Sequence, residues 1–304
     1  IIVLMYHRFE ENKYPSTNIK IADFIKHLNL IKKAQFKFIN PTNFENSLLS
    51  KKKERKILIT IDDGFQSFYD QAWPILKKEK IPFILFVNTR EVGTRGYMNW
   101  KQIREISKEK FAHIGNHSHS HEYLVDMKDE KIIDDINLAS SDFKNNLGYN
   151  SPFFSYPFGE YSNSFKAIIK DLGFKYAFGQ HSGVVDETKD FYELPRFPIN
   201  EAYGELKRFD TILKTVPFKF KSIEPKEKYI QDSNNPPEVI VEFFKDSKNI
   251  NLLNCYSNEL NSWRKSEIDF FDTNKIKIKL IGKFTTERGR INCSLRENDG
   301  SWRW

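Results

Sequence analysis

The 304-residue sequence predicts a parallel α/β domain followed by a smaller β-rich domain. Short apolar runs of strand length alternate with segments in which apolar residues recur at helical spacing, which is typical of parallel sheets covered by helices. After about residue 213 the helical periodicity fades, and residues 276–281 and 291–295 alternate in the manner of half-buried strands. We therefore expect an α/β domain over residues 1–212 and a small β-sandwich-like domain over residues 213–304.

The elements expected in the first domain follow one another as strand and helix. Helical spacing is found after most of the predicted strands, at residues 21–33, from 68, from 98, at 122–147 and at 164–172. His27 falls within the first of these helices, and we expect it at the surface. The predicted strands are residues 1–7, 57–61, 82–87, 111–116, 152–155, 176–178 and 194–197.

Composition and charge exclude several classes of protein. Charged residues make up 29% of the chain and aromatic residues 15%, which is typical of a globular protein rather than a disordered one. No apolar stretch approaches the ~20 residues of a membrane-spanning helix. The net charge of +7 favours anionic partners in general. However, the densest basic run, residues 51–56, directly precedes a predicted buried strand and is most simply a solvated loop, so we expect no nucleic-acid partner.

Two adjacent carboxylates end the strand predicted at residues 57–61. Asp62 and Asp63 fall at its carboxyl end, where α/β sheets and barrels place their chemistry, and Gly64 allows a sharp turn there. Two buried carboxylates are costly without a cation or a hydrogen-bond donor. A solvated acidic turn is the alternative for this short motif on its own.

Two histidines follow another predicted strand end. His117 and His121 are four residues apart, so a helical turn would place both on one face, and His119 would then point away from it. Two imidazoles and one carboxylate are the ligands of a catalytic zinc site that keeps one position open. A pair of surface or core histidines is the alternative.

Three segments resemble, in order, motifs of the polysaccharide deacetylase (NodB-homology) family of carbohydrate esterases. Residues 60–64 (Thr-Ile-Asp-Asp-Gly) resemble its T-F-D-D-G motif, residues 117–121 (His-Ser-His-Ser-His) its H-[ST]-x-x-H motif, and residues 155–159 (Ser-Tyr-Pro-Phe-Gly) its R-x-P-[YF]-G motif. The resemblance covers about residues 1–212. It implies a distorted (β/α) barrel with fewer than eight regular strands.

The resemblance also implies roles for individual residues. Asp63, His117 and His121 would hold a divalent metal, most simply Zn²⁺, with Co²⁺ or Ni²⁺ as alternatives, and Asp62 would be the general base. The backbone N–H of Phe158 would stabilise the oxyanion. His7 ends the first predicted strand and matches the family's histidine general acid, which comes last in most members. Its place at the start of this chain is similar to that in circularly permuted members, including some poly-N-acetylglucosamine deacetylases.

One position departs from the family's pattern. The third motif usually begins with an arginine that pairs with the catalytic aspartate, and here that position is Ser155. Arg196, which lies where the family places a further arginine, is our candidate for orienting Asp62.

Three functions are consistent with these residues. The first is removal of N-acetyl groups from a polysaccharide or oligosaccharide containing N-acetylglucosamine, such as an exopolysaccharide, peptidoglycan or chitin. The second is hydrolysis of O-acetyl esters, and the third is sugar binding by an inactive barrel, which the complete set of metal ligands argues against. By resemblance we expect an extracytoplasmic protein, although no signal segment is visible in this chain.

The predicted C-terminal domain leaves two questions open. Trp263, Trp302 and Trp304 could stack on sugar rings, or they could be core residues. Cys255 and Cys293 could form a disulfide in an oxidising compartment or remain as thiols.

Overall fold

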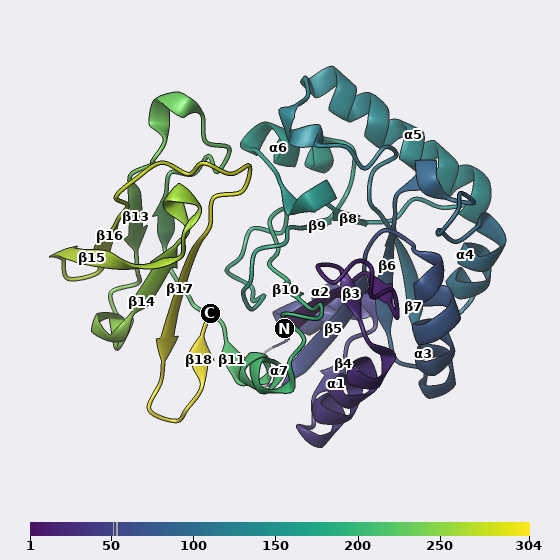
Figure 1. The fold of residues 1–304 in the computed structure, drawn as a ribbon, viewed down its shortest axis with the longest axis horizontal. Helices are drawn as coiled ribbons and strands as arrows, with labels where there is room; N and C mark the ends of the chain where they lie inside the picture. The colour runs from purple at the N-terminus through teal and green to yellow at the C-terminus, as the bar shows by residue number, and fades with distance from the viewer. Residues whose placement is uncertain (51, 53) are drawn as a thin grey trace. The chain divides into compact units, whose positions relative to one another are not determined.

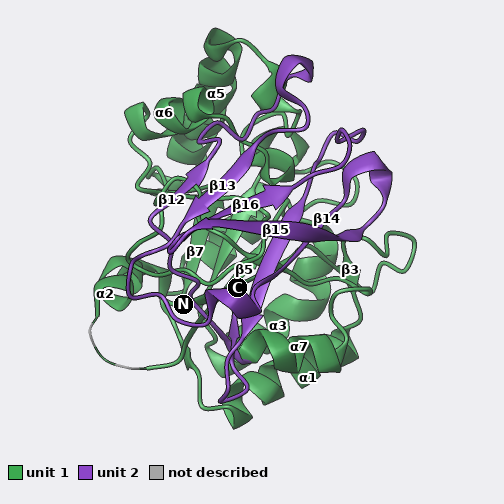
Figure 2. Ribbon diagram, turned by 90° about the vertical axis from the view of Figure 1, so that its left-hand side faces the viewer, with its two compact units in different colours: residues 1–213 green, residues 214–304 purple. Residues whose placement is uncertain are grey.

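The computed structural model describes residues 1–304 apart from residues 51 and 53, which belong to the basic run noted above. The chain divides into two compact units, Ile1–Leu213 and Lys214–Trp304, which are green and purple in Figure 2. Among the described residues, no helix has both the length and the apolar character needed to cross a membrane.

A curled parallel sheet is the centre of the first unit (Figure 1). Seven strands follow one another in the order β10-β1-β5-β6-β7-β8-β9, and β4 pairs with β5 beside this path. The strands β1 and β6 are buried along their whole length, as expected for a parallel sheet covered on both faces. The strands are β1 (Ile2–Tyr6), β4 (Lys37–Phe38), β5 (Lys56–Ile61), β6 (Phe83–Val87), β7 (Ala112–Asn116), β8 (Phe153–Ser155), β9 (Tyr176–Phe178) and β10 (Phe197–Pro198).

The two ends of the sheet are joined by the segment that leads into β10. Phe178 of β9 forms a parallel bridge with Leu194, and the backbone N–H of Gly179 donates to the carbonyl of Leu194 at 3.0 Å. A few residues later β10 pairs with β1, at the other end of the path. The sheet is therefore curled into the distorted barrel that the sequence predicted, with all of its regular strands parallel.

Helices cover the outside of this sheet and form the outer arc in Figure 1. The predicted helix at residues 122–147 begins only at Asp129, because residues 124–126 form a separate 3-10 turn. The α-helices are α1 (Ile21–Lys33), α2 (Phe44–Leu49), α3 (Trp73–Glu79), α4 (Trp100–Ser107), α5 (Asp129–Leu147), α6 (Asn163–Asp171) and α7 (Leu206–Leu213). Shorter elements are the π-helix η2 (Phe68–Ala72), the 3-10 helices η1 (Pro41–Asn43), η3 (Thr89–Glu91), η4 (Leu124–Asp126) and η5 (Pro157–Gly159), and the paired strands β2 (Arg8–Phe9) and β3 (Asn18–Ile19).

The surface position predicted for His27 is wrong. Its side chain is completely buried, with Nε2 2.7 Å from the carbonyl oxygen of Gly204 and Nδ1 3.2 Å from the hydroxyl of Tyr6. The ring also stacks on Phe209 of α7 with centroids 4.0 Å apart. The helical pattern of α1 alone did not reveal that α7 covers this position.

The second unit is a β structure with its own apolar core. Its strands form one path in the order β11-β18-β17-β14-β15-β16-β13-β12. Residues from β13 and β16 and from β14 and β17 share one apolar cluster, so the path folds over on itself as in a sandwich. The strands are β11 (Thr215–Val216), β12 (Ser222–Glu224), β13 (Val239–Glu242), β14 (Asn254–Ser257), β15 (Arg264–Asp272), β16 (Lys275–Lys279), β17 (Ile291–Arg296) and β18 (Trp302–Arg303), with 3-10 turns η6 (Asp232–Asn234), η7 (Ile250–Leu252) and η8 (Glu259–Asn261).

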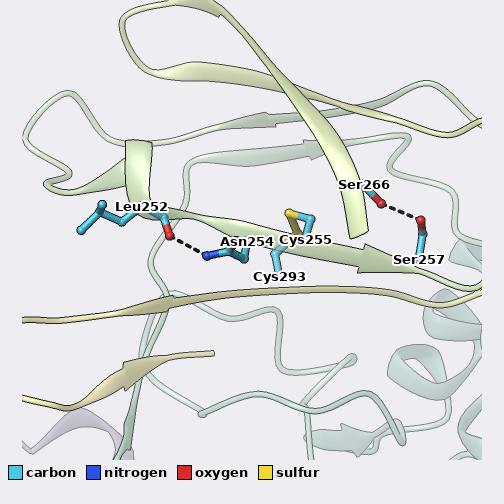
Figure 3. The surroundings of a disulfide bond; sticks show 6 residues. All are labelled: Leu252, Asn254, Cys255, Ser257, Ser266 and Cys293. Carbon is cyan, nitrogen blue, oxygen red and sulfur yellow. Dashed lines mark hydrogen bonds between the residues drawn. A yellow bond between two sulfur atoms is a disulfide. The ribbon is translucent and has the colours of Figure 1, made fainter. Parts of the chain in front are cut away.

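A disulfide links two adjacent strands of this core (Figure 3). Cys255 of β14 lies directly opposite Cys293 of β17, with Cα atoms 4.1 Å apart and an S–S distance of 2.05 Å. The disulfide resolves the question that the sequence left open. Of the three tryptophans, Trp263 is 49% exposed, while Trp302 and Trp304 are half-buried, and sugar binding by this unit stays a prediction.

Candidate active site

The residues singled out by the motifs lie at the carboxyl edge of the barrel sheet. Tyr6 of β1 pairs in register with Ile61 of β5, and the N–H of Asp62 donates to the carbonyl of Tyr6 at 2.9 Å. His7 and Asp62 therefore follow the carboxyl ends of two adjacent strands and lie next to each other at the edge of the sheet. β7 also runs parallel to its neighbours, so His117, the residue after it, emerges at this edge as well.

Three side chains at this edge form a group suited to a metal ion. One possible ligand atom from each of Asp63, His117 and His121 lies within 4.8 Å of the others. The Asp63 Oδ1 atom is 3.3 Å from Nε2 of His117 and 3.2 Å from Nε2 of His121. One carboxylate and two imidazoles are the donor set of catalytic zinc sites.

The hydrogen bonding of His117 fits this group to a metal. Its Nδ1 lies 2.6 Å from the backbone carbonyl of Ser155, an oxygen that can only accept, so Nδ1 carries the proton and Nε2 keeps a lone pair. Nε2 of His117 and Oδ1 of Asp63 are buried and have no hydrogen-bond partner. Two buried, unpartnered acceptors facing each other are unfavourable unless a cation lies between them.

The helical turn expected for residues 117–121 is wrong. These residues form an irregular loop after β7, in which Ser118 has a φ of 69° and His121 a φ of 54°. The N–H of His117 still donates to the carbonyl of Val87 at 3.0 Å, so this residue continues the sheet rather than starting a helix. The two imidazoles meet because the loop curls back, with the N–H of His121 donating to the hydroxyl of Ser118 at 3.0 Å.

The chain turns sharply after β5, as the presence of Gly64 predicted. Asp63 has a φ of 74° and Gly64 a φ of 76°, so two consecutive residues are left-handed. Aspartate tolerates this conformation better than most residues, and glycine adopts it without cost. The turn separates the two carboxylates, so Asp63 faces the histidines while Asp62 remains in the interior of the barrel.

Arg196 holds Asp62 by a bidentate ion pair in the interior of the barrel. Its Nη1 lies 2.7 Å from Oδ1 of Asp62, its Nη2 lies 2.8 Å from Oδ2, and neither residue is exposed to solvent. The remaining donors of Arg196 contact the carbonyl of Gly179 at 2.9 Å and the hydroxyls of Thr60 at 3.2 Å and Ser155 at 2.8 Å. All five N–H donors of the guanidinium thus have an acceptor.

Ser155 completes this network, a contribution that the motifs did not suggest. Its hydroxyl accepts from Arg196 and donates to Oδ2 of Asp62 at 3.3 Å. The serine therefore bridges the two members of the ion pair at the position where the family has an arginine. The signals in the sequence were its place at the end of the buried strand at residues 152–155 and its position in the third motif.

The surroundings keep both aspartates in the charged form. Burial acts to raise the pKa of Asp62, but the Arg196 guanidinium outweighs it and holds that pKa below its usual value. Burial likewise opposes ionisation of Asp63, yet the neighbouring His121 and His7 hold its pKa well below the usual range. A charged Asp62 can accept a proton, and a charged Asp63 is the form that binds a metal.

His7 and Phe158 flank the three possible ligands. Burial lowers the pKa of His7, against the opposing effect of the Asp63 and Asp62 carboxylates nearby. Phe158, in η5, has a φ of 58°, and its ring centroid lies 4.8 Å from that of His121. Its ring also stacks on Tyr123 with centroids 4.3 Å apart. The residues predicted as acid and as oxyanion donor are thus beside the candidate metal site.

His113 and His119 lie outside this group. Nδ1 of His119 is 2.8 Å from the hydroxyl of Thr89 and 3.4 Å from a carboxylate oxygen of Asp142. Nε2 of His113 is 3.1 Å from the hydroxyl of Ser151. Neither contributes an atom to the group formed by Asp63, His117 and His121.

Known proteins resemble this chain in sequence and in fold. Poly-beta-1,6-N-acetyl-D-glucosamine N-deacetylase of Staphylococcus aureus is 27% identical in an alignment of 212 residues that covers 64% of this chain and 72% of the relative. The structure of IcaB from Ammonifex degensii superimposes with a TM-score of 0.64 and 24% identity, covering 70% of this chain and 96% of that one. The Streptococcus pyogenes deacetylase PplD, solved with acetate, gives a TM-score of 0.61 and 21% identity, covering 66% and 92%. The latter two show that the barrel fold is shared.

The family model covers most of the residues of the candidate site. Residues 50–177 match the model named polysaccharide deacetylase, a segment that includes Asp62, Asp63, His117, His121 and Ser155. His7 and Arg196 fall outside the matched segment, at opposite ends of the first unit, and the fold brings them to the same edge. Residues 50–177 thus carry a polysaccharide deacetylase domain, as the three sequence motifs predicted.

Proposed function

We propose that this protein is a metal-dependent hydrolase that removes N-acetyl groups from a polysaccharide containing N-acetylglucosamine. The observation that carries the proposal is the group of three ligand atoms of Asp63, His117 and His121 beside the ion-paired Asp62. The S. aureus relatives named for β-1,6-linked poly-N-acetylglucosamine favour that polymer as the first substrate to test.

The metal, for which zinc is our first choice, would be held by Asp63, His117 and His121. When bound, it polarises the acetyl carbonyl and lowers the pKa of water in the site. Asp62 is the proposed base, since its charged carboxylate is held in one orientation by Arg196 and accepts the proton from the attacking water. Arg196 therefore acts through Asp62 and is a positioning residue.

His7 and Phe158 complete the proposed reaction. The backbone N–H of Phe158 is the proposed donor to the oxyanion, and its left-handed conformation next to His121 supports this role. His7 is proposed to protonate the departing amine. Because burial lowers its pKa, protonated His7 is a stronger acid than an exposed imidazolium, although fewer molecules carry that proton near neutral pH.

We also infer that the protein acts outside the cytoplasm. The Cys255–Cys293 disulfide supports this location, because such bonds persist in oxidising compartments. A polysaccharide of the cell envelope or the extracellular matrix is a substrate available there.

Acetate release from β-1,6- and β-1,4-linked N-acetylglucosamine oligomers tests the proposal. We expect release by the native protein, loss of release after chelation, recovery with added zinc, and no release by Asp62→Asn. The protein could instead bind zinc, release no acetate from either oligomer and release acetate from an O-acetylated polysaccharide. That result would show that the substrate is an ester rather than an amide. A native protein that binds no divalent metal would refute the proposed site.

A further inference from the structure

A side chain of α5 holds the backbone of the loop between the two histidines. The N–H groups of residues 117–122 are not paired as in a helix, so each needs another acceptor. Ser118 donates to the side chain of Asn116 at 2.8 Å, and His121 donates to the hydroxyl of Ser118 at 3.0 Å. These contacts are local, and they leave the N–H groups of His119 and Ser120 to be satisfied from elsewhere.

Asp135 of α5 accepts both of these N–H groups. Its Oδ1 lies 2.8 Å from the N–H nitrogen of His119, and the nitrogen of Ser120 lies 3.0 Å from Oδ2 and 3.3 Å from Oδ1. Hydrogen bonds to a charged carboxylate are about twice as strong as those between neutral groups. A helix on the outside of the barrel therefore hydrogen-bonds to the middle of the loop, at His119, which is two residues from His117 and two from His121.

The opposite side of the loop is held by backbone groups of η3. The N–H of Thr89 donates to the carbonyl of Ser118 at 3.2 Å, and that of Arg90 donates to the carbonyl of His119 at 3.0 Å. No substitution of a side chain removes these bonds, except by proline. Asp135, by contrast, holds two loop N–H groups through its side chain, so a substitution there tests how the loop backbone is positioned.

We propose that Asp135 is a positioning residue that preorganises the loop for metal binding. The inference rests on the proposed metal site. Ser118 and His121 are left-handed, a conformation that non-glycine residues adopt only when their surroundings impose it. With Asp135 in place, Nε2 of His121 lies 3.2 Å from Oδ1 of Asp63. Without it, ordering the loop becomes part of the cost of binding.

Zinc affinity of the full-length protein tests this role, measured by competition with a chromogenic chelator. We expect Asp135→Ala to raise the zinc dissociation constant about 10- to 100-fold, the usual effect of losing a residue that orients metal ligands. Asp135→Asn retains one acceptor oxygen, and Oδ1 already faces both N–H groups, so its loss of affinity is expected to be smaller. Hydrogen exchange without metal should become faster at residues 118–121 in both variants.

Asp134 provides the matched control, because it precedes Asp135 on α5, carries the same charge and is exposed. Asp134→Ala is expected to bind zinc as the native protein does. Equal affinities of Asp135→Ala and the native protein would overturn the inference, as would an equal loss in the Asp134 and Asp135 variants, which would indicate a general effect of charge. A native protein that binds no zinc would instead refute the proposed metal site itself. If Asp135→Ala fails to fold, Asp135→Asn and the exchange rates decide the question.

Discussion

Arg196→Ala is expected to destabilise the barrel by leaving a buried carboxylate without its cation. Asp62 and Arg196 are both completely buried, and the two bonds between them measure 2.7 and 2.8 Å. Removing one partner of such a pair costs about 3–5 kcal/mol, because the remaining charge stays buried without compensation. Turnover should fall about 100-fold, near the lower end of what a positioned base contributes.

A double-mutant cycle separates the ion pair from the volume of the arginine. Asp62→Asn alone leaves the guanidinium without a counter-charge, whereas Asp62→Asn combined with Arg196→Ala leaves no buried charge in the pair. We therefore expect the double variant to lose about 2–3 kcal/mol less stability than the sum of the single variants. Denaturant unfolding followed by circular dichroism gives the free energies, and hydrogen exchange in β5 and β8 assigns them to the first unit.

Two results would refute this reasoning. Losses that add to within about 0.5 kcal/mol would show that the two residues are not energetically coupled. A protein with Arg196→Ala that folds but binds no zinc would place Arg196 in the metal site, although its hydrogen bonds are to Gly179, Thr60, Asp62 and Ser155.

Two further predictions concern stability. Burial lowers the pKa of His27 from 6.5 to about 4, so the unfolded chain binds a proton before the folded one does. The free energy of unfolding should therefore fall by up to about 3 kcal/mol as the pH drops from about 6.5 to about 4, and His27→Phe should flatten this slope in denaturant titrations at several pH values. The disulfide joins cysteines 38 residues apart, so replacing Cys255 and Cys293 with alanine should destabilise the second unit by about 4 kcal/mol. Calorimetry should show this loss with the transition of the first unit unchanged.

Each of these predictions can fail in a specific way. A pH slope unchanged in His27→Phe would mean that His27 is protonated in the folded protein, or that another group dominates the acid range. His113 is the obvious second group, since burial lowers its pKa to about 4 as well. A first unit that melts earlier when only the cysteines are replaced would show that the two units do not unfold independently.

The sequence predicted the parts of the site that depend on sheet topology. Parallel strands bring their carboxyl ends to one edge, so the positions of Asp62, Asp63 and His117 followed once the strands before them were recognised. The apolar runs made those strands easy to find, since β1, β5 and β6 are buried over almost their whole length. The first and last strands are adjacent only through the curl of the sheet, and the resemblance to a permuted family was needed to relate His7 to this edge.

The conformation of the loop could not be predicted from spacing. A separation of four residues is compatible with one helical turn, but the acceptor for the N–H groups of His119 and Ser120 belongs to α5, which begins eight residues after His121. Helical spacing in the sequence also extended to residue 122, although that helix begins at Asp129. Local patterns describe what a segment can form, and here contacts with distant elements decide what it does form.

Position 155 shows why the site tolerates a departure from the family's pattern. Two groups of this residue face the site: its carbonyl receives Nδ1–H of His117, and its hydroxyl links Arg196 to Asp62. Any residue supplies the carbonyl, so the protonation of His117 that leaves Nε2 available does not depend on the side chain at this position. The positive charge that an arginine at position 155 would bring to Asp62 comes instead from Arg196, whose guanidinium donates to both carboxylate oxygens. With the charge of Asp62 already balanced by Arg196, the hydroxyl of Ser155 is sufficient at this position, because it accepts from Arg196 and donates to Oδ2 of Asp62.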